Sequence, residues 1–357
     1  MDAVTSKAKP SKGKIGNANI EAKREAYYAR ISKMDLAPLW KVLKDIIPAE
    51  PKTVCAPAIW HFKDVKASIH EAGGLITAEE AQRRVLVIEN PNLRGKSRVT
   101  QSLYAGYQLI MPGEVAPPHR HSASAIRFIL DGGGAYTQVD GEKTIMNSGD
   151  FVTTPHWTMH DHGNASKEPM IWLDVLDVPT VNFFETSFYE HFENEKQNTR
   201  REDQDSLARF GSGVLPDGTD TSLNRSPIIN YPYAKMKPVL DRLVKAGDVD
   251  PRHGARVRYA NPFNGGWVMP TMGANLAMLP KGFKGKEYRS TDSAIFVCQE
   301  GEGTTKVAGQ TFEWGPKDLF IIPSWMKYSH QAKKDSVLFS ISDRPAQELL
   351  GIWREQA

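Results

Sequence analysis

Five of the ten histidines lie between residues 119 and 162, at spacings that fit a metal site. His119 and His121 are two residues apart. Residues at this spacing on an extended strand point to the same face, so both imidazoles can face one ion. His160 lies in a second β-like run and can supply a third ligand. Three neutral imidazoles suit iron, zinc, copper or nickel, and they leave coordination positions open, as a catalytic site requires.

An internal repeat helps to decide whether the three histidines form a metal site or have a structural role. In the second copy, Tyr288, Ser290 and Tyr328 replace the three histidines, whereas a Ser-Ala-Ile run, two spaced glycines and a tryptophan are retained. Histidines with a purely structural role would have no reason to be lost as a set. We therefore predict a metal site in the first copy and none in the second. The matching segments are residues 124–134 with 293–303 and residues 149–162 with 317–330.

Short strands must position these residues. From about residue 85, β-like runs alternate with turn signals such as Asp140-Gly141, a pattern typical of a sandwich or barrel. The same pattern returns near residue 266, and the repeat makes the two β regions copies of one fold. The expected parts are a tail and helical arm (1–84), a metal-binding β domain (85–178), a linker with a helix (179–260) and a β domain without metal ligands (261–357).

The N-terminal part has a helical pattern. Residues 1–18 are polar, and we expect them to be mobile. Asn19 can cap the helix that follows. A second short helix should end at Pro48, and a third should cover Asp64–Gly73.

The composition excludes several classes of protein. The 45 basic and 42 acidic residues nearly balance, so nucleic acid is not an evident partner. No run approaches the roughly 18 apolar residues of a membrane-spanning helix, and the N-terminus lacks the apolar stretch of a signal peptide. Cys55 and Cys298 are far apart and lie beside apolar residues. We expect buried free thiols in a cytoplasmic protein rather than a disulfide framework.

The two histidine segments resemble the cupin motifs. The first has His119-x-His121 between two spaced glycines, and the second has His160 followed by Asn164. The glutamate usual after the first pair is missing, because Ala-Ile-Arg occupies residues 125–127. Over about residues 20–350 the chain is similar to the gentisate 1,2-dioxygenases and their relatives acting on salicylate and 1-hydroxy-2-naphthoate. The most selective segments are "APPHRHSASAIRFIL", "GDFVTTPHWTMHDHGN" and "WLDVLDVP".

This resemblance implies an all-β bicupin fold, two jelly-roll barrels with a helical N-terminal arm, and commonly a homotetramer. It implies one Fe(II) per chain, held in the N-terminal cupin by His119, His121 and His160. The partners would be a small aromatic carboxylate and O2. The implied reaction is extradiol-type cleavage between the carboxyl-bearing and hydroxyl-bearing carbons of an ortho-hydroxybenzoate, with gentisate giving maleylpyruvate.

Alternative functions remain open at this point. Salicylate, a halo- or nitro-substituted salicylate or 1-hydroxy-2-naphthoate could replace gentisate as the substrate. A non-oxidative metal-dependent cupin, an isomerase or a decarboxylase, is a more distant alternative. A storage-like or regulatory bicupin is a third class, and the intact histidine set argues against it.

Two arginines could bind a substrate carboxylate. Arg127 lies six residues after His121, so on a regular strand it shares the histidine face. An inward arginine is costly unless it is paired, and a guanidinium matches a carboxylate bidentately. The repeat has Phe296 at this position. The resemblance implies a catalytic role for Arg127 and a second carboxylate contact for Arg83, which could otherwise be a solvated arginine at a helix end.

His162 shares a face with His160, and the resemblance implies that it bonds the substrate hydroxyl and acts in catalysis, taking the hydroxyl proton. Its retention as His330 in the repeat favours a structural role instead.

Three further residues could line the substrate pocket. Gln108 and Tyr104 are four residues apart and match pocket positions of the family, although core packing also explains Tyr104. Asp174, inside an apolar strand, could orient a ligand histidine or an arginine, or contact a ring substituent at position 5. His156 follows Pro155 in an expected turn, and we predict that it is not a ligand.

Overall fold

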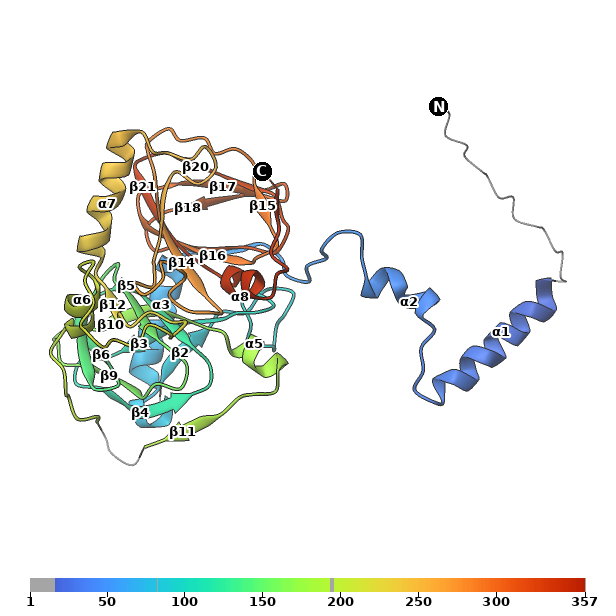
Figure 1. Cartoon of the computed structure of the whole chain (residues 1–357), viewed down its shortest axis with the longest axis horizontal. Coiled ribbons are helices and arrows are strands. Elements are labelled where there is room, and N and C mark those ends of the chain that lie inside the picture. Colours follow the sequence, from blue (N-terminus) through green and yellow to red (C-terminus); the bar gives the residue numbers. More distant parts are fainter. Residues whose placement is uncertain (1–16, 82, 193–195, 357) are drawn as a thin grey trace. The chain divides into compact units, whose positions relative to one another are not determined.

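The computed structural model describes residues 17–81, 83–192 and 196–356, and these residues fall into two units. The first unit ends at Lys52 and contains helices α1 (Asn17–Ser32) and α2 (Leu39–Ile46) (Figure 1). Because α1 begins at Asn17, Asn19 lies inside the helix, and the prediction that it caps the helix is wrong. Residues 1–16, part of the segment expected to be mobile, lie outside the described residues.

The second unit begins at Thr53 and contains two β barrels, the first of which holds the histidine segments (Figure 1). The six-stranded sheet of the first barrel has the order β12 (Asn230–Tyr231), β8 (Phe151–Thr154), β5 (Ala125–Asp131), β10 (Met170–Leu176), β3 (Tyr104–Ile110) and β2 (Arg84–Val87). Its five-stranded sheet has the order β11 (Tyr189–His191), β4 (Val115–His121), β9 (His160–Asn164), β6 (Gly133–Val139) and β7 (Glu142–Asn147). Strands β6 and β7 meet at the predicted Asp140-Gly141 turn, where both residues have a positive φ, as a two-residue hairpin favours.

The second barrel repeats this plan. Its large sheet has the order β1 (Ala58–Trp60), β19 (Leu319–Ile322), β16 (Ala294–Glu300), β21 (Ser336–Ser342), β14 (Gly273–Leu279) and β13 (Ala255–Arg258). Facing strands are β18 (Gln310–Trp314), β17 (Gly303–Val307) and β20 (Tyr328–Ala332), together with the pair β15 (Arg289–Ser290) and β22 (Glu355–Gln356). Two barrels of the same plan confirm the predicted all-β bicupin fold.

Each barrel takes an edge strand from the segment that precedes the other barrel. Strand β1 precedes the first barrel but pairs with β19 of the second. Strand β12 precedes the second barrel but pairs with β8 of the first. Each of these strands is followed by a helix, α3 (Phe62–Leu75) or α7 (Tyr233–Ala246), and then by an edge strand of the other barrel. The repeat in the fold is therefore longer than the repeat visible in the sequence.

The same exchange fixes the starts of the two helices. The Phe62 N–H at the start of α3 donates to Asp318 Oδ1 (2.8 Å), and the Tyr233 N–H at the start of α7 donates to Asp150 Oδ1 (2.9 Å). Asp150 and Asp318 are equivalent residues of the repeat. A carboxylate at a helix N-terminus satisfies free N–H groups and complements the helix dipole. Each helix is thus anchored on the barrel that does not follow it in the chain.

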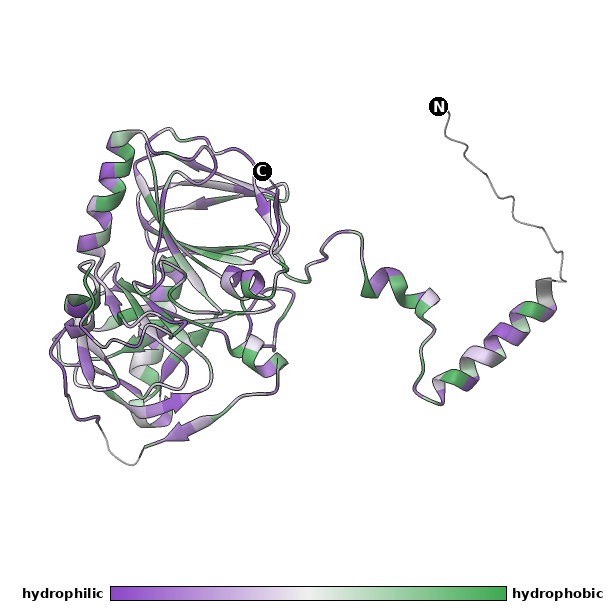
Figure 2. Cartoon of the chain, viewed as in Figure 1, coloured by the Kyte–Doolittle hydropathy of each residue, from purple (hydrophilic) through white to green (hydrophobic). Residues whose placement is uncertain are grey.

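An apolar core joins the barrels. The rings of Phe128 on β5 and Phe339 on β21 stack with their centroids 3.9 Å apart, and Phe151 packs against Phe339. The largest apolar cluster contains residues from both barrels, and α7 contributes the fully buried Leu240 to it. Figure 2 shows alternating apolar and polar bands along α7, as expected for a helix with one packed side.

Short helices complete the described chain. They are α4 (Ala78–Ala81), α5 (Val178–Phe183), α6 (Asp205–Phe210) and α8 (Arg344–Leu349). Among the described residues, no helix is long and apolar enough to cross a membrane. Both cysteines are buried free thiols, as predicted.

Two equivalent aspartates connect the barrels. Asp177 precedes α5 and Asp343 precedes α8. Asp177 accepts hydrogen bonds from Ser124 N–H of its own barrel (2.8 Å) and from the Thr271 hydroxyl beside β14 (2.5 Å). In the same way, Asp343 accepts from Ser293 N–H (2.9 Å) and from the Ser102 hydroxyl beside β3 (2.7 Å). Burial is the main cause that raises the pKa of each carboxyl to about 6.

These carboxyls make stability depend on pH. Because their folded-state pKa lies above the unfolded value, the folded protein holds extra protons between about pH 4 and pH 6. Their contribution to stability is full below that range and is lost as the pH rises through 6, by at most about 3 kcal/mol for each residue. The buried histidines have the opposite effect, because their lowered pKa values make them stabilise the fold as the pH rises. We therefore expect the contribution of the two aspartates to appear as a difference between variants in urea denaturation between pH 4 and pH 7.

The Asp177→Asn variant isolates the effect. Asparagine can accept from Ser124 N–H and donate to Thr271 without titrating, so the free energy of unfolding of the variant, relative to that of the unaltered protein, should rise between pH 4 and pH 7. Asp248→Asn, at an exposed position, is the matched control and should differ from the unaltered protein by the same amount at each pH. A difference that does not change with pH in Asp177→Asn would contradict the assignment.

Candidate metal and substrate site

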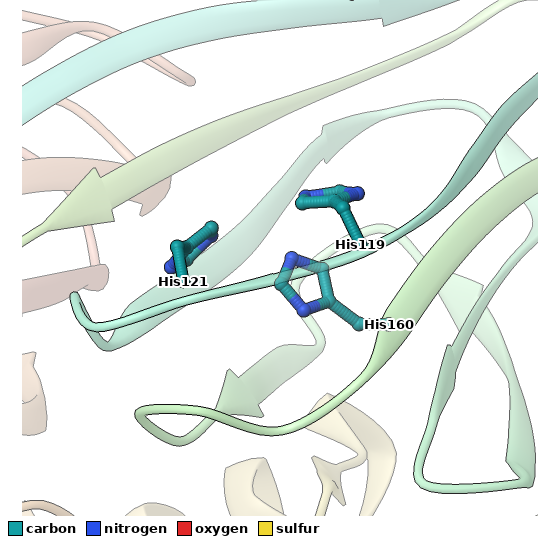
Figure 3. Close-up of side chains that lie close together, drawn as sticks. All are labelled: His119, His121 and His160. Atoms are coloured by element: carbon teal, nitrogen blue, oxygen red, sulfur yellow. The ribbon is translucent and has the colours of Figure 1, made fainter. Parts of the chain in front are cut away.

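Three histidines converge inside the first barrel (Figure 3). His119 and His121 lie on β4, and His160 is the first residue of β9, directly opposite His119 in the strand register. One ring nitrogen of each residue lies within 4.8 Å of the others. The i, i+2 spacing and the β4–β9 pairing together produce this cluster.

Backbone carbonyls fix the orientation of all three rings. The Nδ1 atoms of His119, His121 and His160 lie 3.0, 2.7 and 2.9 Å from the carbonyl oxygens of residues 117, 123 and 158. A carbonyl can only accept, so each Nδ1 donates a proton and each Nε2 carries a lone pair and no proton. This is the usual arrangement that orients metal-binding histidines.

Burial keeps the cluster neutral. Desolvation is the main cause that lowers the pKa of His119 to about 3 and that of His121 to about 4, and it lowers the pKa of His160 well below its usual value. The Arg83 and Arg127 charges lower the pKa values of His119 and His121 further. All three imidazoles are therefore neutral near pH 7, the form that binds a metal.

The donor set fits a metal ion. His160 Nε2 is buried and has no hydrogen-bond partner, although an unpaired buried polar atom is costly. His119 Nε2 lies 2.9 Å from Arg83 Nη1. Arg83 also donates to the hydroxyl of Tyr189 on β11 (3.4 Å). The Tyr189 ring stacks on the ring of His119. A metal ion at this cluster would satisfy the His160 nitrogen and replace the Arg83 contact at His119.

Arg127 lies inside the barrel beside the histidines. It is only 3 % exposed, and its guanidinium Nε lies 3.0 Å from Asp174 Oδ1, although the two atoms are not aligned as a hydrogen bond. Asp174 is opposite Arg127 in the β5–β10 register. Arg127 also donates to the Thr154 hydroxyl (2.5 Å). Burial raises the pKa of Asp174, and the Arg127 charge opposes that rise.

His162 is enclosed between two partners. Its Nε2 lies 2.9 Å from Arg127 Nη2, and its Nδ1 lies 3.0 Å from the Thr137 hydroxyl. Because a guanidinium only donates, Nε2 is the acceptor and Nδ1 carries the proton. Burial lowers the pKa of His162 well below its usual value, so the ring is neutral. Both ring nitrogens are thus already used, and the Thr–His pair recurs as Thr305 and His330 (2.8 Å).

A cavity of about 540 Å³ opens beside these groups. Four of the predicted substrate residues line it: Arg83, Tyr104, Gln108 and Asp174. Burial raises the pKa of Tyr104 to about 12, so its hydroxyl keeps its proton. The structure therefore brings the predicted metal and substrate residues to one end of one barrel. His156 is exposed and is not in the cluster.

The second barrel has an apolar interior at the equivalent place. Tyr288 and Tyr328 form the bridge that His119 and His160 form in the first barrel, with ring centroids 5.8 Å apart. Phe296, which replaces Arg127, stacks on Phe320, and Ser340 lies opposite it where Asp174 lies opposite Arg127. In the described part of this barrel, neither the buried charge pair nor the histidine cluster is present at the equivalent place.

The sequence analysis missed several residues of the site. Thr137 and Thr154 hold His162 and Arg127, and Tyr189 stacks on His119. Lys96 and Arg98 line the cavity from the loop between β2 and β3. The recurrence of a threonine opposite His162 and His330 is a signal that could have identified Thr137. No spacing pattern identifies the other four.

Comparisons with known proteins agree with this geometry. The Cupin domain family model matches residues 106–176. The chain is 50 % identical over 336 residues to gentisate 1,2-dioxygenase 1 of Aquipseudomonas alcaligenes, covering 94 % of this chain and 97 % of that protein. It is 35 % identical to 5-aminosalicylate 1,2-dioxygenase of a Comamonas species, covering 93 % of this chain and 90 % of that protein.

A solved structure is similar over almost the whole chain. Salicylate 1,2-dioxygenase from Pseudoaminobacter salicylatoxidans, as an adduct with gentisate, has a TM-score of 0.88 and 30 % identity, covering 99 % of this chain and 96 % of that one. The extent of these similarities, together with the two barrels and the histidine cluster, shows that the chain belongs to the gentisate 1,2-dioxygenase family of ring-cleaving bicupin dioxygenases.

Proposed function

We propose that this protein is an Fe(II)-dependent dioxygenase that opens the ring of gentisate to give maleylpyruvate. The observation that carries the proposal is the neutral three-histidine cluster beside a buried arginine. Arg83, which contacts His119, and Asp174, which pairs with Arg127, line a cavity large enough for a single-ring aromatic acid. The relative with 50 % identity is named as a gentisate dioxygenase, and the similar solved structure holds gentisate.

The metal ligands would be His119, His121 and His160, with one iron for each chain. Their neutral imidazoles suit a divalent transition metal, and three protein ligands leave positions for the substrate and O2. Bound iron supplies electron transfer between the aromatic ring and O2, so that no external reductant is required. The chain itself supplies a buried site and holds the rings through the three backbone carbonyls.

Arg83 and Arg127 would bind the substrate carboxylate. Arg83 donates to His119 Nε2, the atom that would bind a metal. Metal binding would therefore release the Arg83 guanidinium beside the cavity that this residue lines. Arg127 is held in place by its ion pair with Asp174 and by its hydrogen bonds with Thr154 and His162. A guanidinium held in this way can bind a carboxylate without losing much side-chain freedom.

His162 would act next to the substrate hydroxyl. Its neutral Nε2 is an acceptor, and it can take the hydroxyl proton only if its bond to Arg127 is exchanged for one to the substrate. Gln108, Tyr104 and Asp174 would form the wall against the ring, with Asp174 also fixing Arg127.

The proposal also covers the location of the enzyme in the cell and its oligomeric state. Two buried free thiols support a cytoplasmic enzyme. A homotetramer, expected from the resemblance, stays a prediction.

The histidine cluster can be tested by metal analysis. His119→Ala removes a ligand, so the purified variant reconstituted with Fe(II) without oxygen should retain less than about a tenth of the iron of the unaltered protein. Tyr288→Phe, at the equivalent position of the second barrel, is the control and should keep one iron per chain. Full iron content in His119→Ala would exclude this residue as a ligand.

The reaction can be tested by oxygen consumption. Fe(II)-loaded protein should consume one O2 for each gentisate while the absorbance of the ring-opened product appears. Salicylate, 5-nitrosalicylate and 1-hydroxy-2-naphthoate form the comparison panel, and gentisate should have the highest kcat/KM. If none of these compounds causes oxygen uptake, the proposed dioxygenase activity is wrong.

Substitutions at Arg127 can distinguish a loss of gentisate affinity from a loss of stability. Arg127→Met leaves Asp174 buried without its partner and should lower the free energy of unfolding by about 3 kcal/mol or more. Adding Asp174→Leu should recover most of that loss because no charge is then left unpaired. Calorimetry should show that both variants bind gentisate at least tenfold more weakly than the unaltered protein. Unchanged affinity in the stable double variant would exclude a carboxylate contact for Arg127.

A further inference from the structure

The cavity continues beyond the groups that the proposed function uses. Its wall also contains Lys96, Ser97 and Arg98, from the loop between β2 and β3. A volume of about 540 Å³ lies in the range that encloses drug-sized ligands, more space than a single-ring hydroxybenzoate fills. Three basic residues, Arg83, Lys96 and Arg98, therefore face one cavity, and only Arg83 has a role in the proposed function.

Neither added cation is neutralised. Among the described residues, no carboxylate oxygen lies within 4.0 Å of a side-chain nitrogen of Lys96 or Arg98. The one hydrogen bond of the Arg98 guanidinium is a long contact of 3.5 Å to the Gln101 carbonyl. Glu89 is the acid beside this loop, and its carboxylate accepts the Ser97 N–H (2.9 Å). Asp174, a carboxylate that also lines the cavity, is paired with Arg127. The wall thus has a net positive charge and donor groups that can bind an anion.

The loop is held in place by its own hydrogen bonds. The Asn90 N–H donates to the Arg98 carbonyl (2.8 Å), and the Asn90 side chain donates to the Val99 carbonyl (3.2 Å) and accepts from Ala56 N–H (3.0 Å). Asn90 is fully buried. The backbone that carries the two cations is therefore ordered before any ligand binds, which lowers the entropy cost of recognition.

We propose that Lys96 and Arg98 form an outer anion-binding subsite, which recognises a second anionic group on the aromatic substrate. The inference rests on the proposed function, in which the carboxylate and the neighbouring hydroxyl face the histidine cluster and Arg83. Ring position 5, para to that hydroxyl, then points away from the cluster. An anionic group there would meet the Lys96 ammonium and the Arg98 guanidinium, with the Ser97 hydroxyl as a further donor.

The subsite would also increase the association rate of substrates that carry a single negative charge. Charges of one sign along a cleft raise the local concentration of an oppositely charged ligand and increase its association rate. This contribution falls as ionic strength rises. The substrate class favoured by this cavity is therefore an ortho-hydroxybenzoate with an anionic substituent at position 5, ahead of one with an apolar substituent there.

The experiment compares the affinities of salicylate and 5-sulfosalicylate for Fe(II)-loaded protein under argon, by calorimetry at low ionic strength. The unaltered protein should bind 5-sulfosalicylate about tenfold more tightly than salicylate, the effect of one or two charge-assisted hydrogen bonds. The Lys96→Gln/Arg98→Gln variant should lose this preference while its affinity for salicylate changes less than threefold. The association rate of 5-sulfosalicylate should also depend less on salt in this variant.

A matched control removes the same charge elsewhere. Arg242→Gln/Lys306→Gln changes two exposed cations that do not line the cavity, and it should retain the preference. If the unaltered protein shows no preference for 5-sulfosalicylate, or if the Lys96/Arg98 variant retains it, the subsite does not exist. These measurements require no turnover. A preserved preference without oxygen uptake would overturn the proposed dioxygenase function and leave the anion subsite standing.

Discussion

The positive charge of Arg127 inside the first barrel is the constraint on which the site depends. A buried charge without compensation costs several kcal/mol, so the surrounding strands must supply partners at fixed positions. The β5–β10 register supplies Asp174, and β8 and β9 supply Thr154 and His162. The same exclusion of water that makes these partners necessary keeps the neighbouring imidazoles neutral. One property, burial, therefore holds the guanidinium rigidly and leaves three nitrogen lone pairs available to a metal.

The second barrel has the same plan as the first but lacks a buried charge at the place of Arg127. Phe296 and Ser340 occupy the places of Arg127 and Asp174, and aromatic rings pack at the place of the histidine cluster. The features that join the two barrels are retained in both: the aspartate before α5 and α8, the aspartate at the start of α3 and α7, and the exchanged edge strand. The second barrel thus shares the structural contacts of the first but not its cluster of histidines and buried charges.

The sequence predicts the fold class and much of the site, because those predictions depend on local periods. His119 and His121 share a face through the two-residue period of a strand, and the repeat identifies which copy lost its ligands. The pairing of Asp174 with Arg127 depends on strand register, which tertiary packing decides. The exchange of β1 and β12 was not visible either, since strands of two or three residues have no measurable period. The predicted cap at Asn19 was wrong because a cap is defined by where the helix begins, and α1 begins two residues earlier.

The exchanged strands also determine the order in which this molecule can fold. His61, next to β1, contacts Asp318, which is 257 positions further along the chain. Contacts at such separations form late, because the chain loses entropy in closing a long loop before the contact stabilises it. During synthesis the strands of the first barrel emerge well before Phe339, the ring that covers Phe128. The N-terminal barrel therefore has an exposed apolar face until Phe339 has been synthesised, and its native packing requires both copies.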